Sequence, residues 1–269
     1  MNKRRLSYNK IKYQKHCSKQ VFGLFLLCTV ALLLHSCGID RNIKKGEKFL
    51  AIGEYHDAAT QFKTAYQRTP AKDRAQRGQL AAKMAFCYDR ISSSQRAIAT
   101  YQNVIRYKQD DKDTHLKLAA NLMKAGAYPE AIKEYNIALD SMPDNDIAKE
   151  GLTAATKAPA IKEQGSYYQV KKMDKFNSRR QDYSPMLFGD QYNQLYFTST
   201  RNDAQGDEVS GITGVKPGDI FVSEKDEKGK WTTPHTIESG LNSEADEGTP
   251  AFSVDGREMY ITQCLTDPT

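Results

Sequence analysis

The sequence predicts a multidomain chain in which an all-α helical repeat is followed by a β region. Small and aromatic residues recur with a period near 34 between residues 41 and 157, which is typical of stacked helix pairs. After residues 158–160, the period of the apolar residues changes from about 3.6 to about 2, and turn residues recur. We therefore expect helices over 41–157, a linker over 158–180 and strands over 181–269.

The charge of the chain is unevenly distributed. Its 269 residues include 39 basic and 33 acidic side chains, a formal net charge of +6, and 39% are hydrophobic. This composition excludes collagen, a coiled-coil rod, a disordered polar tail and a multi-span membrane protein. The first 36 positions hold seven basic residues and no acidic residue. The remaining 32 basic and 33 acidic residues give a net charge of −1, so net charge does not indicate a nucleic-acid partner.

The N-terminal segment has the pattern of a secretory signal. An uncharged run of 14 residues, Val21 to Leu34, follows the basic residues. It is shorter than the about 20 residues that a membrane-spanning helix needs. A basic segment followed by a short apolar run is typical of a signal peptide.

The residues after this run, Leu34-His35-Ser36-Cys37, resemble the bacterial lipobox, in which the cysteine is acylated and becomes the new N-terminus. The resemblance implies a signal peptide over 1–36, a lipidated N-terminus and short tether over 37–40, and membrane lipid as a partner through Cys37. Two or more acyl chains hold a protein stably on a membrane, whereas one does not. An ordinary secretion signal or a short signal anchor is the alternative.

Three copies of one pattern make up the helical region. The first runs from Gly53 through Ala58 and Phe62 to Pro70, and the third from Gly126 through Ala131 and Tyr135 to Pro143. A weaker copy contains Ala97 and Tyr101. The pattern resembles the tetratricopeptide repeat, which implies a right-handed superhelix of three repeats.

The spacing of the repeats has physical causes. Small residues are expected where two helices cross closely. These are Gly46, Ala58, Ala85, Ala97, Ala119 and Ala131. Aromatic residues should fill the space between repeats, and the longer spacing from Ala58 to Ala97 places about five extra residues in a loop around 70–76. Residues 147–157 continue as a capping helix.

The first helices of such repeats line a concave face. The resemblance places seven residues in this predicted protein-binding groove: Glu47, Leu50, Phe86, Asp89, Arg90, Met123 and Lys124. Apolar, aromatic and charged side chains together are typical of a surface that binds a peptide or protein. The alternative is that they only face solvent or an adjoining domain.

The β region also contains two related stretches. Each has a proline in its first strand, Pro185 or Pro250, and an aromatic second strand, and the prolines are 65 residues apart. Asp255-Gly256 is typical of a tight hairpin turn. These features resemble WD40-like repeats of the TolB type, which implies a β-propeller. We expect Trp231 to pack between its blades.

Residues 181–269 supply only about one and a half blades, whereas a propeller needs about four to eight. We therefore expect an incomplete β-propeller that belongs to a longer protein.

The sequence gives little indication of catalysis. Its histidines beyond the leader are isolated from other metal-ligating residues, and no nucleophile, zinc-protease or phosphate-loop motif occurs. Cys87 and Cys264 show no paired spacing and are expected to be single thiols. We expect a non-enzymatic protein without cofactor or metal.

The order of lipobox, tetratricopeptide repeats and TolB-like strands resembles outer-membrane lipoproteins of type IX secretion, of the PorE type. This resemblance implies a scaffold on the periplasmic face of the outer membrane, with secretion-system subunits as envelope partners. Peptidoglycan would be bound only by a C-terminal region outside this sequence. A glycan- or nutrient-binding lipoprotein is the alternative function.

Overall fold

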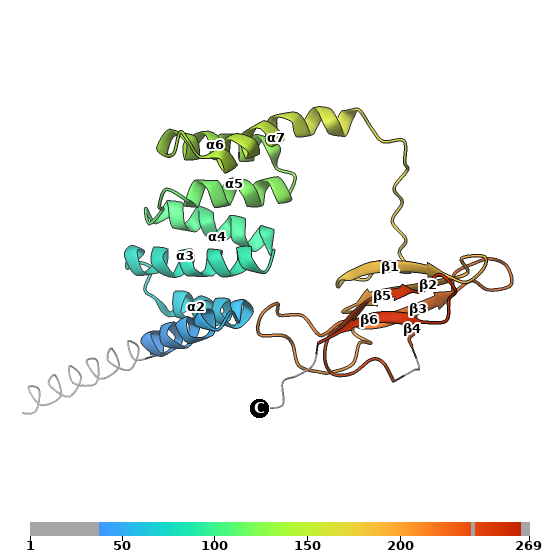
Figure 1. The fold of residues 1–269 in the computed structure, drawn as a ribbon. Helices are drawn as coiled ribbons and strands as arrows, with labels where there is room; N and C mark the ends of the chain where they lie inside the picture. The colour runs from blue at the N-terminus through green and yellow to red at the C-terminus, as the bar shows by residue number, and fades with distance from the viewer. Residues whose placement is uncertain (1–37, 238–239, 265–269) are drawn as a thin grey trace, which may run out of the picture. The chain divides into compact units, whose positions relative to one another are not determined.

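The computed structural model describes residues 38–237 and 240–264, and the chain divides into two compact units between Pro159 and Ala160. The predicted signal peptide and Cys37 lie outside the described residues. Helical residues 38–51 begin the described part of the first unit. Its other helices are α2 (Tyr55–Arg68), α3 (Arg74–Arg90), α4 (Ser94–Arg106), α5 (Thr114–Lys124), α6 (Tyr128–Ser141) and α7 (Asp146–Glu163). From α2 to α6, each helix packs against the next in the chain, which gives a stack of helix pairs (Figure 1).

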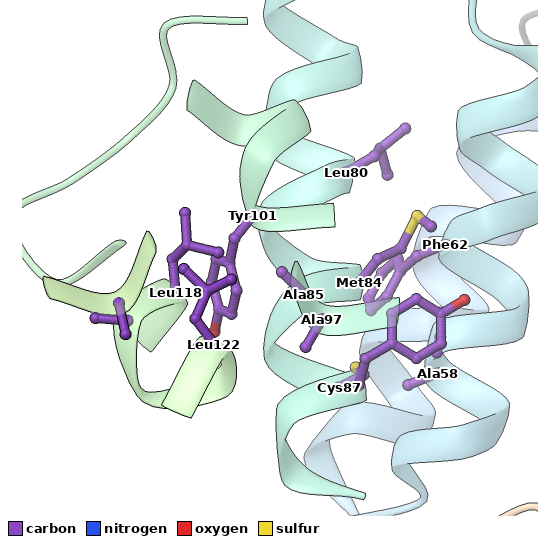
Figure 2. Close-up of a cluster of buried hydrophobic side chains, with 14 of the residues drawn as sticks. Ala58, Phe62, Leu80, Met84, Ala85, Cys87, Ala97, Tyr101, Leu118 and Leu122 are labelled. Atoms are coloured by element: carbon purple, nitrogen blue, oxygen red, sulfur yellow. The ribbon is translucent and has the colours of Figure 1, made fainter. Parts of the chain in front are cut away.

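Small residues allow the helices of each pair to approach closely, as the sequence predicts. A Cβ atom on Gly46 would lie 2.6 Å from Cε1 of Phe62. Five alanines at the corresponding positions have no exposed surface: Ala58, Ala85, Ala97, Ala119 and Ala131. The larger side chains Phe62, Met84, Tyr101 and Leu118 fill the space around them (Figure 2). The core of the unit is therefore built from alternating small and large residues.

The extra residues between the first two repeats form helix rather than loop. Helix α3 has 17 residues, whereas α5 has 11, and only residues 69–73 separate α2 from α3. The expectation of a longer loop around 70–76 is thus wrong. The reason is an N-cap, since the Asp73 side chain accepts a hydrogen bond of 3.0 Å from the backbone N–H of Gln76 and begins α3 early.

Both ends of the helical region extend beyond the predicted limits. Residues 38–40, predicted as tether, are helical, and Ile39 is buried against the core. Helix α7 continues through Pro159 to Glu163, six residues into the predicted linker. A proline removes one N–H donor from a helix, but the backbone N–H of Gln164 still donates to the carbonyl of Ala160 at 3.0 Å. One missing hydrogen bond therefore does not end this helix.

The second unit contains two antiparallel sheets. The first has the order β1 (Asp182–Phe188), β2 (Gln194–Ser199), β3 (Asp219–Glu224) and β4 (His235–Thr236). The second is a hairpin of β5 (Glu247–Phe252) and β6 (Met259–Gln263). The predicted antiparallel strands are thus present in the described residues, and the incomplete propeller stays a prediction.

The two sheets begin with the same irregularity. The register of β1 on β2 shifts between Tyr183 and Met186, and that of β5 on β6 shifts between Gly248 and Ala251. In each strand the residue before the proline has a positive φ angle, 51° at Ser184 and 50° at Thr249. Such bulges aim side chains and end regular pairing. The 65-residue repeat in the sequence is thus a repeat of backbone geometry.

Aromatic residues cover both faces of the first sheet. On one face, Phe188 stacks on Phe252 of the hairpin at 4.0 Å between ring centroids, and Tyr196 contacts Phe252 at 4.9 Å. On the other face, Phe176 packs edge-on against Phe197 and Trp231. Trp231 therefore packs against Phe176, on the face of the first sheet opposite the hairpin. Its expected place between two blades stays a prediction.

The pKa values of two aspartates of this unit are shifted in opposite directions. Burial raises the pKa of Asp182, but hydrogen bonds from Ser199, Arg201 and Ser178 outweigh burial and lower it. Burial raises the pKa of Asp219, and the nearby carboxylates of Glu247 and Asp246 raise it further. One Asp219 oxygen accepts from the backbone N–H of Gln205 at 2.9 Å, and the other has no partner among the described residues.

Replacing Gly46 by alanine should destabilise the helical unit. The new methyl group would overlap the Phe62 ring, and overpacking of this kind costs about 1–3 kcal/mol. Urea unfolding followed by circular dichroism measures the change, with Lys48→Ala on the exposed side of the same helix as control. Unchanged stability of the Gly46→Ala protein would contradict the close crossing.

Asp182→Asn and Asp219→Asn should change stability in opposite directions at pH 7. The first variant weakens a buried ion pair of 2.9 Å with Arg201, which costs about 3 kcal/mol. The second removes a charge that burial and neighbouring carboxylates disfavour, and should stabilise the unit.

The pH dependence separates these two causes. A raised pKa favours folding at low pH and opposes it as pH rises, so the gain from Asp219→Asn should shrink as pH falls toward the ordinary aspartate value of 3.8. The lowered pKa of Asp182 stabilises the fold above 3.8, so the loss from Asp182→Asn should persist down to that pH and shrink only below it. Thermal unfolding between about pH 2 and 7 covers both windows. Losses of equal size in the two variants would contradict this account.

Candidate protein-binding surface

The seven predicted groove residues lie on the first helix of each helix pair. Glu47 and Leu50 are on the helix of residues 38–51. Helix α3 supplies Phe86, Asp89 and Arg90, and α5 supplies Met123 and Lys124. We call this set the first-helix surface.

Apolar side chains form the centre of the first-helix surface. Leu50 and Met123 are partly buried and pack against the core, whereas the side chain of Phe86 remains 40% exposed. The ring of Tyr55 meets Phe86 edge-on, with 6.2 Å between ring centroids. A partner that covers Phe86 would therefore bury an aromatic ring that is already held in position.

Charged pairs join the first helices of neighbouring repeats. Glu47 accepts a hydrogen bond from the Lys83 ammonium group across the first two repeats. Asp89 accepts 2.9 Å and 3.4 Å hydrogen bonds from Asn121 and Lys124 in the third. The guanidinium group of Arg90 instead lies over the ring of Tyr55, with 5.2 Å from its carbon to the ring centroid. Many of the charged groups that the sequence predicts to contact a ligand thus form hydrogen bonds with other residues of the repeats.

Sequence reasoning missed three residues that shape this surface: Tyr55, Lys83 and Asn121. Lys83 lies three residues before Phe86 and so shares its helix face, which is a signal that was available. Asn121 lies three residues before Lys124 in the same way. Tyr55 belongs to the second helix of its pair, so the spacing along the first helices could not have indicated it.

Buried polar groups lie beneath the surface. The Tyr101 hydroxyl has no hydrogen-bond partner among the described residues. Burial raises its pKa, and the nearby carboxylates of Asp89 and Asp111 add to this effect. Burial also raises the pKa of the Cys87 thiol to about 11, so this side chain is protonated at neutral pH and unreactive. Cys264 is exposed, and both cysteines are free.

The described residues offer little for metal chemistry or membrane crossing. They contain no group of three histidine, cysteine or carboxylate side chains that could hold a metal ion. His115 hydrogen-bonds to Glu134 at 2.6 Å and joins α5 to α6. No helix within 38–237 or 240–264 has the length and apolar character needed to cross a bilayer.

Comparisons with known proteins concern helical repeats. No protein-family model matches the chain. DnaJ homolog subfamily C member 3 of Gallus gallus is 30% identical over 129 residues, which are 46% of this chain and 24% of that protein. This chain thus spans about a quarter of the length of the curated relative that it matches.

Three solved structures give similar results. The first TPR of Spaghetti (RPAP3), bound to an HSP90 peptide, is 19% identical, covers 46% of this chain and 95% of its own, and has a TM-score of 0.39. The P58(IPK) TPR domain is 18% identical, and the match covers 51% of this chain and 38% of that chain, with a TM-score of 0.41. The Sgt2 TPR domain of Aspergillus fumigatus is 16% identical, and the match covers 51% of this chain and 88% of that chain, with a TM-score of 0.38. With the recurring helix pairs and the curated relative, the N-terminal region is tetratricopeptide-like.

Proposed function

We propose that this chain is a non-enzymatic adaptor that binds envelope proteins through its first-helix surface. The observation that supports this most directly is the exposed Phe86 ring, held by Tyr55 and flanked by paired charges. Binding energy in protein interfaces concentrates in a few aromatic and arginine side chains surrounded by groups that exclude water. Phe86 and Arg90 fit the central role, and the pairs around Glu47 and Asp89 fit the rim.

The β unit is proposed to be one blade and the first two strands of the next blade of a TolB-like propeller. The four-stranded antiparallel order, the hairpin packed on its face, and the two matching bulges support this assignment. Such a blade would give the chain a second surface for partners, in addition to that of the repeats.

We further propose that the protein is held at the outer membrane by acylated Cys37 and serves type IX secretion. The supporting observation is the order of lipobox, repeats and TolB-like strands, which resembles PorE-type lipoproteins. The periplasmic face is the proposed location.

Replacing Phe86 and Met123 together by alanine should block export of cargo proteins. The two changes remove the apolar centre, and loss of a central aromatic side chain costs about 2 kcal/mol or more of binding energy, which is about 30-fold in affinity. The measurement compares secreted cargo in a deletion strain complemented with the parent or the variant. Ile147→Ala with Ile161→Ala is the matched control, because both side chains are exposed and apolar on α7.

Normal export by the Phe86/Met123 variant, at equal protein level, would contradict the role of this surface. If the deletion strain exports normally but fails to grow on one nutrient, the adaptor proposal fails and the uptake function is favoured.

Cys37→Ala should abolish incorporation of labelled palmitate. The thiol is the proposed acylation site, so no other residue should replace it. Cells are labelled, and the protein is precipitated with an antibody against residues 41–157. Equal labelling of the parent and the variant would disprove lipidation at this position.

A further inference from the structure

The helix of residues 38–51 has a buried face and an exposed face of different character. Its inward residues follow the spacing of one helix face and pack against the core. They are Ile39, Ile43, Gly46 and Leu50. This face fixes how the helix is oriented within its unit.

Four basic residues lie together on the outward face. Arg41, Lys44, Lys45 and Lys48 are all exposed, and their spacing of three, four and seven residues places them on one side of the helix. None of the four pairs with a carboxylate among the described residues. The acidic residues of this helix, Asp40 and Glu47, share a neighbouring face, where Glu47 bonds to Lys83.

Helix α7 in the same unit provides a comparison. Its exposed charged residues are three acidic and three basic side chains: Asp146, Lys149, Glu150, Lys157, Lys162 and Glu163. Lys149 also pairs with Asp144 and Asp146. A terminal helix that serves only to keep a repeat stack soluble needs a polar outer face, and mixed charges as on α7 are sufficient. On the first helix, by contrast, four basic side chains lie together and the two acidic residues, Asp40 and Glu47, lie on a neighbouring face.

The position of the basic face in the chain indicates its partner. Arg41 is four residues after Cys37 and seven after the last residue of the apolar run, Leu34. An acylated Cys37 and a short signal anchor would both hold this point of the chain at a membrane. Residues 38–51 are helical, so the chain rises only about 5 Å from residue 38 to 41 and about 10 Å from residue 41 to 48. These lengths are comparable to the screening distance of about 8–10 Å in physiological salt.

We propose that Arg41, Lys44, Lys45 and Lys48 form a docking surface for anionic lipid headgroups, which lays the first helix against the membrane. The inference rests on the proposed membrane anchoring and adds a second, electrostatic contact to it. Clusters of four or more basic residues beside a membrane anchor bind anionic lipid, and each charge strengthens binding about fivefold. Net charge does not produce this attraction, because the residues after position 36 have a net charge of −1.

The test uses a chain of residues 38–269, which lacks the leader and any acyl group. Both hydrophobic cores are built from residue 39 onward, so this chain keeps every described contact. It is sedimented with phosphatidylcholine vesicles and with vesicles that contain phosphatidylglycerol, at about 50 mM salt, where screening is weaker than at physiological salt. We expect binding to the anionic vesicles only, and a drop in the partition coefficient of about fivefold per charge when all four residues are replaced by glutamine.

A variant with Lys133, Lys149, Lys157 and Lys162 replaced by glutamine loses the same charge from α6 and α7 and should bind like the parent. Absence of parent binding to anionic vesicles, or an equal loss in the two quadruple variants, would overturn the proposal. Capture by polyglutamate beads without vesicle binding would assign the surface to an acidic protein and would also overturn it. Palmitate labelling at Cys37 is independent of these results, so a failure of the anchor is distinguishable from a failure of the docking surface.

Discussion

Close crossing of paired helices at a small residue is the constraint on which the helical unit depends. At Gly46 there is no room for a methyl group beside Phe62, and the corresponding alanines have no exposed surface. Glu47 and Phe86 directly follow two of these positions, Gly46 and Ala85, so the crossing that buries the small residue also fixes the direction of the next side chain. Glu47 pairs with Lys83, which links the first helices of the first two repeats.

The second unit depends on polar constraints as well as aromatic packing. The guanidinium group of Arg201 donates to Asp182, Ser199 and the carbonyl of Phe176, and it lies over the rings of Phe197 and Phe221. One side chain thus joins the start of β1, the end of β2 and the segment before the sheet. Removing a buried charge from such a network leaves its partner unpaired, which costs more than the pair contributes. The first sheet is therefore sensitive to single changes at these positions.

Structural features that repeat along the chain could be predicted from the sequence, whereas features that occur once could not. Small residues at fixed spacing located the helix crossings, and the prolines 65 residues apart located two strands with the same bulge. The extension of α3 escaped prediction because the Asp73 cap is a local hydrogen bond with no repeat. Helix α7 continues past Pro159 because one lost donor is tolerated in a run of alanines and lysines. The pairing of Asp89 with Asn121 connects residues 32 apart, which no local pattern reveals.

The proposed partner contact and the proposed membrane contact would use different faces of the first helix. Exposed ion pairs such as Glu47 with Lys83 contribute less than about 1 kcal/mol, so a partner can rearrange them at little cost. Full burial of an exposed phenylalanine ring contributes about 1.5–3 kcal/mol, and Phe86 is 40% exposed, so covering the rest of the ring would contribute about 1 kcal/mol. Charge attraction to a membrane acts over about a Debye length and needs no close fit. Partner choice should therefore depend on the apolar centre across the repeats, whereas membrane docking should depend on the number of charges on the outward face, and changes in one face should leave the other function intact.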